Sequence, residues 1–201
     1  MLRIIILISI LGFISGSILY AELIPKAVRG IDIVACSTDG NPGTANVYLL
    51  CGKKCGTLTA ILEFAKGFFP VLLGNILIPP EYRTYTFALI IIAPVMGHIF
   101  SIFHNWNGGL GIATTFGTMI AIFLQSRLLV LLVGDYAIGK FALKFRHKYY
   151  RTLFVFGAFL VELLLLNSKD AYSMAYFCIA CIIILKCIAV NHKNSIQSIP
   201  K

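Results

Sequence analysis

Long apolar runs separated by short polar stretches dominate the pattern of this chain. The runs cover approximately residues 4–24, 56–78, 84–104, 111–126, 128–144, 152–167 and 171–190. A transmembrane α-helix needs about 20 apolar residues, and in hydrocarbon its backbone polar groups must be satisfied within the helix itself. The pattern therefore predicts an all-α integral membrane protein with about seven transmembrane helices, or about six if the short fourth and fifth runs form one helix.

The polar stretches predict the connections between these helices. The longest covers about residues 25–55, where four glycines and Pro42 are expected to break any helix in its middle. The first run is predicted to be a retained helix, because it is too long for the apolar part of a signal peptide and no small-residue cleavage site precedes Pro25. We expect residues 1–201 to form one polytopic membrane domain, with residues 25–55 as a cytoplasmic loop.

Composition supports a membrane protein and narrows the chemistry. The chain is 59% hydrophobic and 12% charged, whereas soluble globular proteins carry about 25% charged residues. An ordinary soluble domain is therefore excluded. The six cysteines lie in apolar runs or in the expected cytoplasmic loop, where thiols stay reduced. They lack the clustered Cys and His partners of a zinc site, so a zinc site is not expected.

The formal net charge of +9 indicates orientation rather than nucleic-acid binding. Cytoplasmic loops of membrane proteins carry an excess of Lys and Arg, which also meet anionic phospholipids. With the N-terminus outside and seven alternating helices, twelve of the 17 Lys and Arg residues fall inside and four outside, while Lys66 lies within a helix. The count predicts an N-terminus outside, a cytoplasmic C-terminus and residence in the cell membrane.

Ionisable residues inside apolar runs are candidates for function, because burying them in a membrane is costly. Glu63 and Lys66 are three residues apart in the second run, close enough to pair on one helix face. Two interpretations stay open: an ion pair within the helix, or a substrate-facing Lys66. Asp135 and Glu162 lie in later runs with no partner identifiable from the sequence.

Two glycine-rich segments point to anion binding. Residues 37–46 can place successive backbone N–H groups around an anion, because glycine adopts positive φ angles. In residues 97–114 the glycines precede an apolar run, so the N-terminus of a helix would face the loop and attract phosphate. In the predicted topology both segments and His192 share the cytoplasmic surface. We infer a site for a phosphorylated, partly lipidic substrate.

At these segments the chain resembles the bacterial membrane glycerol-3-phosphate acyltransferases that use acyl phosphate, the PlsY family. Residues 40–47 are similar to the family's Gly-Asn-x-Gly-Ala-Thr-Asn-Val, and residues 97–103 to Gly-His-x-Phe-Pro-x-Phe. Residues 108–114 match Gly-Gly-Lys-Gly-Val-Ala-Thr at most positions, and residues 192–196 are similar to His-Arg-x-Asn-Ile. The resemblance extends over almost the whole chain.

The resemblance implies transfer of a fatty acyl group from acyl phosphate to the 1-hydroxyl of glycerol 3-phosphate. The product, lysophosphatidic acid, is a precursor of phospholipids, and the active site would face the cytoplasm. No cofactor, metal or nucleic-acid partner is implied. The implied catalytic residues are His98, Lys66 and His192. The implied substrate- and phosphate-binding residues are Gly40, Asn41, Gly43, Asn46, Gly108, Gly109, Gly111 and Thr114.

Several positions depart from the family pattern. Asp39 stands where the family has Ser, and three cationic positions are occupied by Leu49, Asn107 and Leu110. Since both expected substrates are anions, these changes predict a pocket poor in positive charge. A second hypothesis therefore stays open: a catalytically impaired paralogue that binds lipid or a partner protein. A transporter or channel ranks below both, because the chain has no internal repeat.

Overall fold

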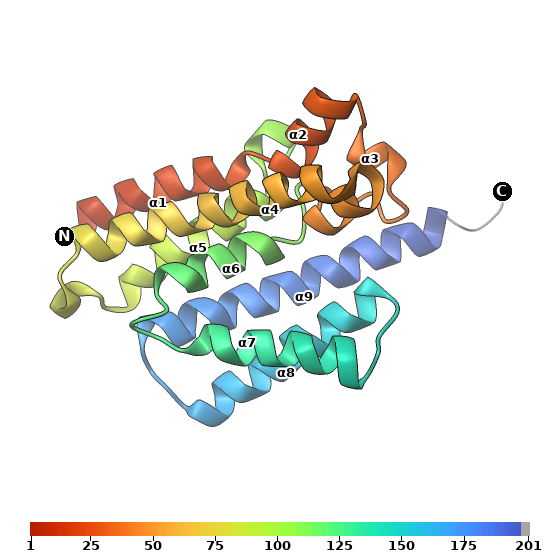
Figure 1. The fold of residues 1–201 in the computed structure, drawn as a ribbon. Helices are drawn as coiled ribbons and strands as arrows, with labels where there is room; N and C mark the ends of the chain where they lie inside the picture. The colour runs from red at the N-terminus through yellow and green to blue at the C-terminus, as the bar shows by residue number, and fades with distance from the viewer. Residues whose placement is uncertain (198–201) are drawn as a thin grey trace.

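The computed structural model describes the backbone of residues 1–197, which forms helices joined by turns (Figure 1). The helices are α1 (Leu2–Ser17), α2 (Tyr20–Arg29), α3 (Ile33–Cys36), α4 (Thr44–Leu77), η1 (Pro80–Tyr82), η2 (Tyr85–Phe87), α5 (Ala88–Ile99), η3 (Ile102–His104), α6 (Ile112–Ala121), α7 (Leu128–Ala137), η4 (Ile138–Ala142), α8 (Lys148–Leu166) and α9 (Ala171–Gln197). Side chains are described as far as His192, so those of Lys193 and Ser195 lie outside the described part, as does all of Lys201. The all-α prediction is confirmed for the described residues.

Five helical segments of the described chain are long and apolar enough to cross a membrane. They are Leu2–Arg29, Thr44–Leu77, Tyr85–His104, Lys148–Leu166 and Ala171–His192. The fourth and fifth apolar runs form shorter elements: α6, and α7 continued by the π-helical turn η4. Seven spans and the sidedness of the termini therefore stay predictions.

The expected loop over residues 25–55 is shorter than predicted. α2 continues to Arg29 and α4 begins at Thr44, so only residues 30–43 connect them, and these include the short helix α3. Gly52 does interrupt helical geometry, with φ 81° and ψ 177°. Because a glycine tolerates this conformation, the chain bends at Gly52 and resumes as a helix instead of leaving it. The prediction of a loop over residues 44–55 was wrong for this reason.

The first apolar run also differs from the single helix expected. Ile18 and Leu19 leave helical geometry and separate α1 from α2. Three backbone groups freed at this break are bound by buried polar side chains. The carbonyl of Ser17, for example, accepts a 2.6 Å hydrogen bond from the Ser101 hydroxyl.

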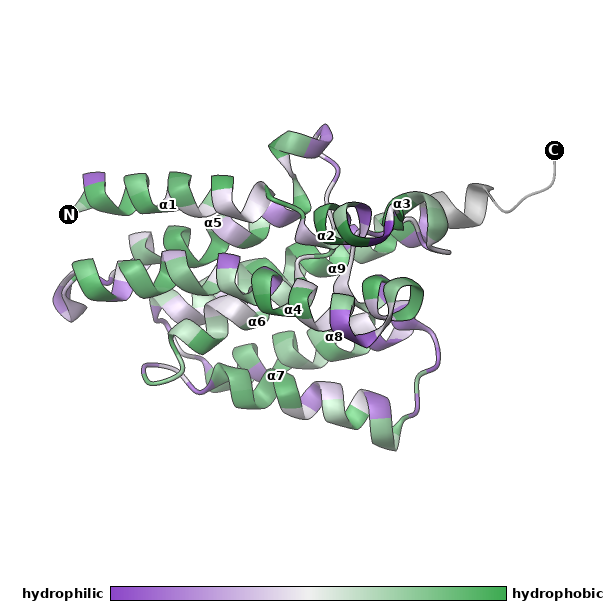
Figure 2. Ribbon diagram, turned by 45° about the horizontal axis from the view of Figure 1, so that its top comes forward, coloured by the Kyte–Doolittle hydropathy of each residue, from purple (hydrophilic) through white to green (hydrophobic). Residues whose placement is uncertain are grey.

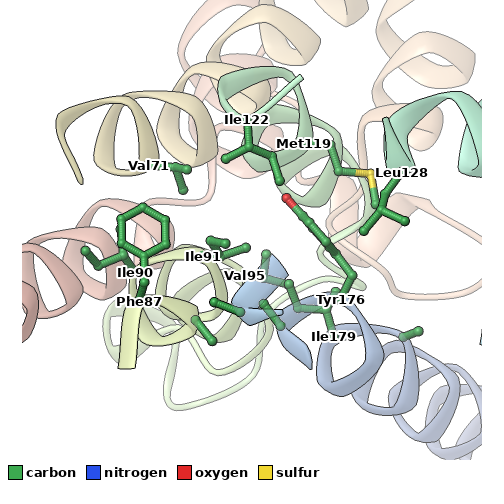
Figure 3. Packing of buried hydrophobic residues seen from close by; sticks show 14 of the residues in the cluster. Val71, Phe87, Ile90, Ile91, Val95, Met119, Ile122, Leu128, Tyr176 and Ile179 are labelled. Atoms are coloured by element: carbon green, nitrogen blue, oxygen red, sulfur yellow. The ribbon is translucent and has the colours of Figure 1, made fainter. Parts of the chain in front are cut away.

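α9 lies between two groups of helices, with α1, α4, α5 and α6 on one side and α7 and α8 on the other (Figure 1). Figure 3 shows the apolar core where α5 and α9 meet, with Ile91 and Val95 facing Tyr176 and Ile179. The phenol of Tyr176 is fully buried, and its hydroxyl donates to Thr118 at 3.2 Å. α9 is therefore anchored to both α5 and α6.

Glycines allow the helix backbones to approach closely. A Cβ atom on Gly16 of α1 would lie 2.1 Å from the carbonyl oxygen of Pro94 in α5. A Cβ on Gly117 of α6 would lie 2.0 Å from the carbonyl oxygen of Phe64 in α4. Small residues at such interfaces are typical of membrane helices, which associate through close van der Waals contact.

The outer surface is largely apolar. In Figure 2 hydrophobic residues run along the helices, while hydrophilic ones gather at turns and helix ends. Leu7, Ile10 and Leu11 on α1 and Leu164 and Leu165 on α8 are among the large apolar side chains that are at least half exposed. Such a surface fits contact with lipid tails and agrees with an integral membrane protein.

We predict that Gly16→Ala separates α1 from α5 and lowers the midpoint of thermal unfolding in detergent by about 5 °C. Gly157→Ala is the matched control, because a Cβ at Gly157 of α8 meets nothing within 4 Å. The control should unfold at or slightly above the wild-type temperature. Equal midpoints for the two variants would contradict the close approach.

Candidate active site

Three ionisable side chains meet in the interior between α4 and α5. Lys66 Nζ lies 2.8 Å from Glu63 Oε2, and His98 Nδ1 lies 3.0 Å from the same oxygen. Lys66 Nζ and His98 Nδ1 are 2.8 Å apart. The exposed fractions of Glu63, Lys66 and His98 are 1%, 3% and 4%. Of the two interpretations, the structure shows the ion pair between Glu63 and Lys66. His98 contacts both side chains and completes a cluster of three.

The break between α1 and α2 supplies two further hydrogen bonds to this cluster. Lys66 Nζ donates to the carbonyl of Ile18 at 2.6 Å. The backbone N–H of Ala21 donates to Glu63 Oε1 at 3.2 Å. Thr114 on α6 lies 3.5 Å from the other carboxylate oxygen of Glu63. Since a buried charge without partners is strongly destabilising, the break supports the cluster directly.

Within the second glycine-rich segment, residues 97–114, Gly108 and Gly109 pack on His98. A Cβ on Gly108 would lie 1.8 Å from the carbonyl oxygen of His98, and one on Gly109 would lie 2.4 Å from His98 Nε2. No side chain fits at either position. The imidazole thus presents Nδ1 to Glu63 and Lys66 and Nε2 to Gly109.

A cavity of about 480 Å³ opens beside His98. Its walls come from both glycine-rich segments and from α4, α5, α6, α7 and α8. The lining residues are Asn41, Gly43, Thr44, Ala45, Asn46, Tyr48, Ala60, Phe64, His98, Leu110, Gly111, Ile112, Ala113, Phe116, Tyr136, Lys148, Arg151 and Thr152. Most of the lining is apolar, and the polar groups come mainly from the first glycine-rich segment and the start of α8. A volume of this size suits a small ligand with an apolar part.

Asp39, Asn46 and Lys148 form a polar group at the cavity. Lys148 Nζ lies 2.9 Å from Asp39 Oδ2 and donates to Asn46 Oδ1 at 2.5 Å. The amide of Asn46 in turn donates to Asp39 Oδ1 at 2.7 Å and to the carbonyl of Asn41 at 2.8 Å. Partial burial alone would raise the pKa of Asp39, but hydrogen bonds from Lys148 and Asn46 outweigh it and hold this pKa below its ordinary value.

The structure brings most of the residues predicted from the sequence to one place. Asn41, Gly43, Asn46 and Gly111 line the cavity with His98, while Lys66 and Thr114 lie in or beside the buried cluster. Gly108 and Gly109 pack on His98. Two predicted residues lie apart from this arrangement. Gly40 is exposed with φ 58°, and His192 is exposed on α9 and does not belong to the cavity lining.

Sequence reasoning missed two cations of the cavity. Lys148 and Arg151, on the first turn of α8, line it, although both precede the apolar run predicted at residues 152–167. The expectation of a pocket poor in positive charge was therefore wrong. The sequence does contain a signal, since the two residues are three apart and share a helix face. Their direction depends on how α8 packs, which the sequence does not specify.

Among the described residues, no group of three or more His, Cys, Asp or Glu side chains could hold a metal ion. The free thiols of Cys51 and Cys55 are buried on α4 and contribute nothing to the cavity lining. The polar groups that line the cavity are an imidazole, two cations, amides, hydroxyls and backbone groups.

The fold and the site define a helical membrane protein with an apolar cavity that carries a buried histidine and two cations. The chain belongs to the glycerol-3-phosphate acyltransferase family, whose model, described as "Glycerol-3-phosphate acyltransferase", matches residues 6–201. The family assignment made from the motifs is thereby confirmed.

Individual relatives agree with this assignment. A glycerol-3-phosphate acyltransferase of Hydrogenobaculum sp. (strain Y04AAS1) is 36% identical over 58% of this chain and 57% of its own length. That of Myxococcus xanthus (strain DK1622) is 34% identical over 62% of this chain and 63% of its own length. The matched regions thus span less than two thirds of these curated relatives.

A solved structure shares the fold over nearly the whole chain. The crystal structure of PlsY (YgiH), an integral membrane glycerol 3-phosphate acyltransferase in its glycerol 3-phosphate form, superposes with a TM-score of 0.78. The identity is 24%, and the match covers 96% of this chain and 92% of PlsY. The lysophosphatidic acid form of PlsY matches with a TM-score of 0.71 and 23% identity.

We predict that Glu63→Gln or Lys66→Met alone lowers the midpoint of thermal unfolding by about 10 °C, because each leaves its partner's charge buried and unpaired. In the double variant the midpoint should fall by clearly less than the sum of the decreases in the two single variants. Lys54→Met, at an exposed position of α4, controls for the loss of a positive charge. Additive losses in a double-mutant cycle would show that the two side chains are not coupled.

The lowered pKa of Asp39 predicts a dependence of stability on acid pH. The ionised carboxylate stabilises the fold fully above the ordinary pKa of 3.8, and its contribution is lost as the pH falls through the lowered value. At pH 7, Asp39→Asn should lower the unfolding midpoint by about 2 °C. In parallel melting scans the difference between the variant and the wild type should shrink as the pH falls below 3.8. A constant difference at all pH values would contradict the ion pair.

Proposed function

We propose that this protein transfers a fatty acyl group from acyl phosphate to the 1-hydroxyl of glycerol 3-phosphate. The hydroxyl oxygen bonds to the acyl carbon, the bond from that carbon to the phosphate oxygen breaks, and inorganic phosphate leaves. The product is lysophosphatidic acid. The observation that carries this proposal is the cavity itself, in which a buried imidazole, glycine-rich segments and cations adjoin an apolar wall.

His98 is proposed as the general base. If its Nδ1–H donates to Glu63, 3.0 Å away, then Nε2 carries the lone pair and faces the glycine-rich side of the site. Nε2 would take the proton of the attacking hydroxyl, and Glu63 would stabilise the resulting imidazolium. Lys66 would position Glu63 and offset its charge. These roles make His98 the catalytic residue and the other two positioning residues.

The shape and chemistry of the cavity support both substrates. One wall of the cavity is apolar and suits a fatty acyl chain; it is formed by Ala60, Phe64 and Phe116. Asn41, Gly43 and Gly111 supply amide and backbone groups that suit a phosphate and a glycerol backbone. The amide oxygen of Asn41 is buried and lacks a hydrogen-bond partner among the described atoms. It could accept a hydrogen bond from a substrate hydroxyl.

The relatives support the acceptor and the product. PlsY, which shares the fold, has been solved in a glycerol 3-phosphate form and in a lysophosphatidic acid form. We propose that this chain binds the same two ligands and that it uses acyl phosphate as the donor. We further propose a site open to the cytoplasm in the cell (inner) membrane, with the N-terminus outside, seven spans and surrounding phospholipids.

The test is synthesis of lysophosphatidic acid by the purified full-length protein from acyl phosphate and labelled glycerol 3-phosphate. We predict that His98→Gln lowers kcat by about 100-fold or more, since a positioned general base contributes that much. His192→Gln tests the second predicted catalytic histidine, and His147→Gln, at an exposed position, is the matched control.

Two outcomes would contradict this assignment. A wild-type rate in His98→Gln would remove His98 from the chemistry. Absence of lysophosphatidic acid with folded wild-type protein would reject the acyltransferase and leave the non-catalytic lipid- or partner-binding paralogue.

A further inference from the structure

The two cations of the cavity occupy one face of the first turn of α8. Lys148 begins the helix and Arg151 follows three residues later, so both side chains project on the same side. Both line the cavity beside His98. Leu110, which occupies a lysine position of the resembled motif, lines the same cavity without a charge. The cationic side chains of this cavity lining therefore belong to α8.

Lys148 is held by a carboxylate that a ligand could replace. Its ammonium group has three N–H donors, and two of its contacts go to Asp39 and Asn46. The side chains of Lys148 and Asp39 are 36% and 28% exposed. Ion pairs this accessible to water contribute little net stability, so exchanging one anionic partner for another costs little.

The carboxylate of Asp39 also cancels charge where anions are expected to bind. While Asp39 and Lys148 are paired, Arg151 is the cation of α8 whose charge is not offset by that pair. An incoming phosphate dianion carries more charge than a carboxylate and presents three acceptor oxygens. It can engage Lys148 as a point charge and Arg151 through its planar fork of N–H groups.

We propose that Lys148 and Arg151 form the phosphate-binding pair of this cavity, and that Asp39 is a placeholder anion which Lys148 exchanges for the phosphate of the ligand. The ligand class is a phosphate monoester or acyl phosphate, an identification that rests on the proposed function. Asn46 keeps Lys148 in place during the exchange, because its own amide N–H group remains bound to the carbonyl of Asn41.

Asp39 thereby sets the affinity of the site. It lowers the affinity for any phosphate ligand by competing for Lys148, and it keeps the cation directed at the cavity when no ligand is bound. Its substitution should strengthen binding, and this strengthening should depend on Lys148.

The experiment measures dissociation constants of inorganic phosphate and of glycerol 3-phosphate for the purified full-length protein by calorimetry at low ionic strength. Lys148→Met should weaken binding of both ligands about tenfold or more, because a charge-assisted contact is lost. Asp39→Asn keeps a side-chain oxygen for the N–H groups of Asn41 and Asn46 and should tighten binding about threefold. Added salt should reduce this gain.

The double variant isolates the exchange. In the Lys148→Met background, Asp39→Asn should leave the dissociation constants unchanged, because no ammonium remains to be released. Lys54→Met removes an equal charge at an exposed position of α4 and should bind phosphate like the wild type. Lys148→Gln replaces Lys148→Met if the latter unfolds at a lower temperature than the wild type.

Three results would overturn the proposal: wild-type affinity in both Lys148 variants, unchanged or weaker binding in Asp39→Asn, or equal tightening by Asp39→Asn with and without Lys148. Glycerol as the ligand separates phosphate recognition from recognition of the hydroxyls, since its binding should not respond to any of these substitutions. Acyl transfer is measured separately on the same samples. If phosphate binding follows the expected pattern but no lysophosphatidic acid forms, the enzyme assignment fails and the phosphate-binding pair stands.

Discussion

A carboxylate, an ammonium and an imidazole lie together in an apolar helical bundle, and their joint neutralisation is the constraint on which the rest of the structure depends. Neither Glu63 nor Lys66 can stay charged there alone, because the cost of an isolated buried ion exceeds what packing provides. The pair satisfies most of this need through the 2.8 Å contact on α4. The remaining hydrogen bonds must come from outside α4, and they require neighbouring segments to leave regular geometry.

Two such departures follow. The chain opens between α1 and α2, which directs the carbonyl of Ile18 and the N–H of Ala21 at the cluster. On the other side, Gly108 and Gly109 let a backbone segment lie directly against His98. The same glycines bring the segment that begins α6 next to the first glycine-rich segment, where a Cβ on Gly109 would be 3.0 Å from the carbonyl oxygen of Pro42. The same backbone segments thus pack on the buried charged cluster and shape the cavity.

Hydropathy was sufficient to predict the helical class and the approximate position of each apolar helix, because apolar runs of about 20 residues have few alternatives in a membrane. It could not predict the break at Ile18, since this break is stabilised by Lys66, which is 48 residues away in the chain. The sequence analysis placed residues 44–55 in a loop because glycines usually break helices. In the structure Gly52 only bends a longer helix that begins at Thr44. The glycine-rich motifs located most of the site, because glycines at fixed positions specify the local backbone conformation. Lys148 and Arg151 were missed because their role depends on the packing of α8.

The break between α1 and α2 has a consequence for how variation in this protein is interpreted. Its contributions to the buried cluster come from main-chain atoms, which every amino acid except proline supplies in full. Substitutions at Ile18 or Ala21 that keep the backbone path therefore leave those hydrogen bonds in place. Alanine at position 18 would therefore not reveal that the charged cluster depends on the carbonyl of this residue. Insertions, deletions and prolines are the changes that expose its importance, so the constraint acts on chain length and path rather than on residue identity.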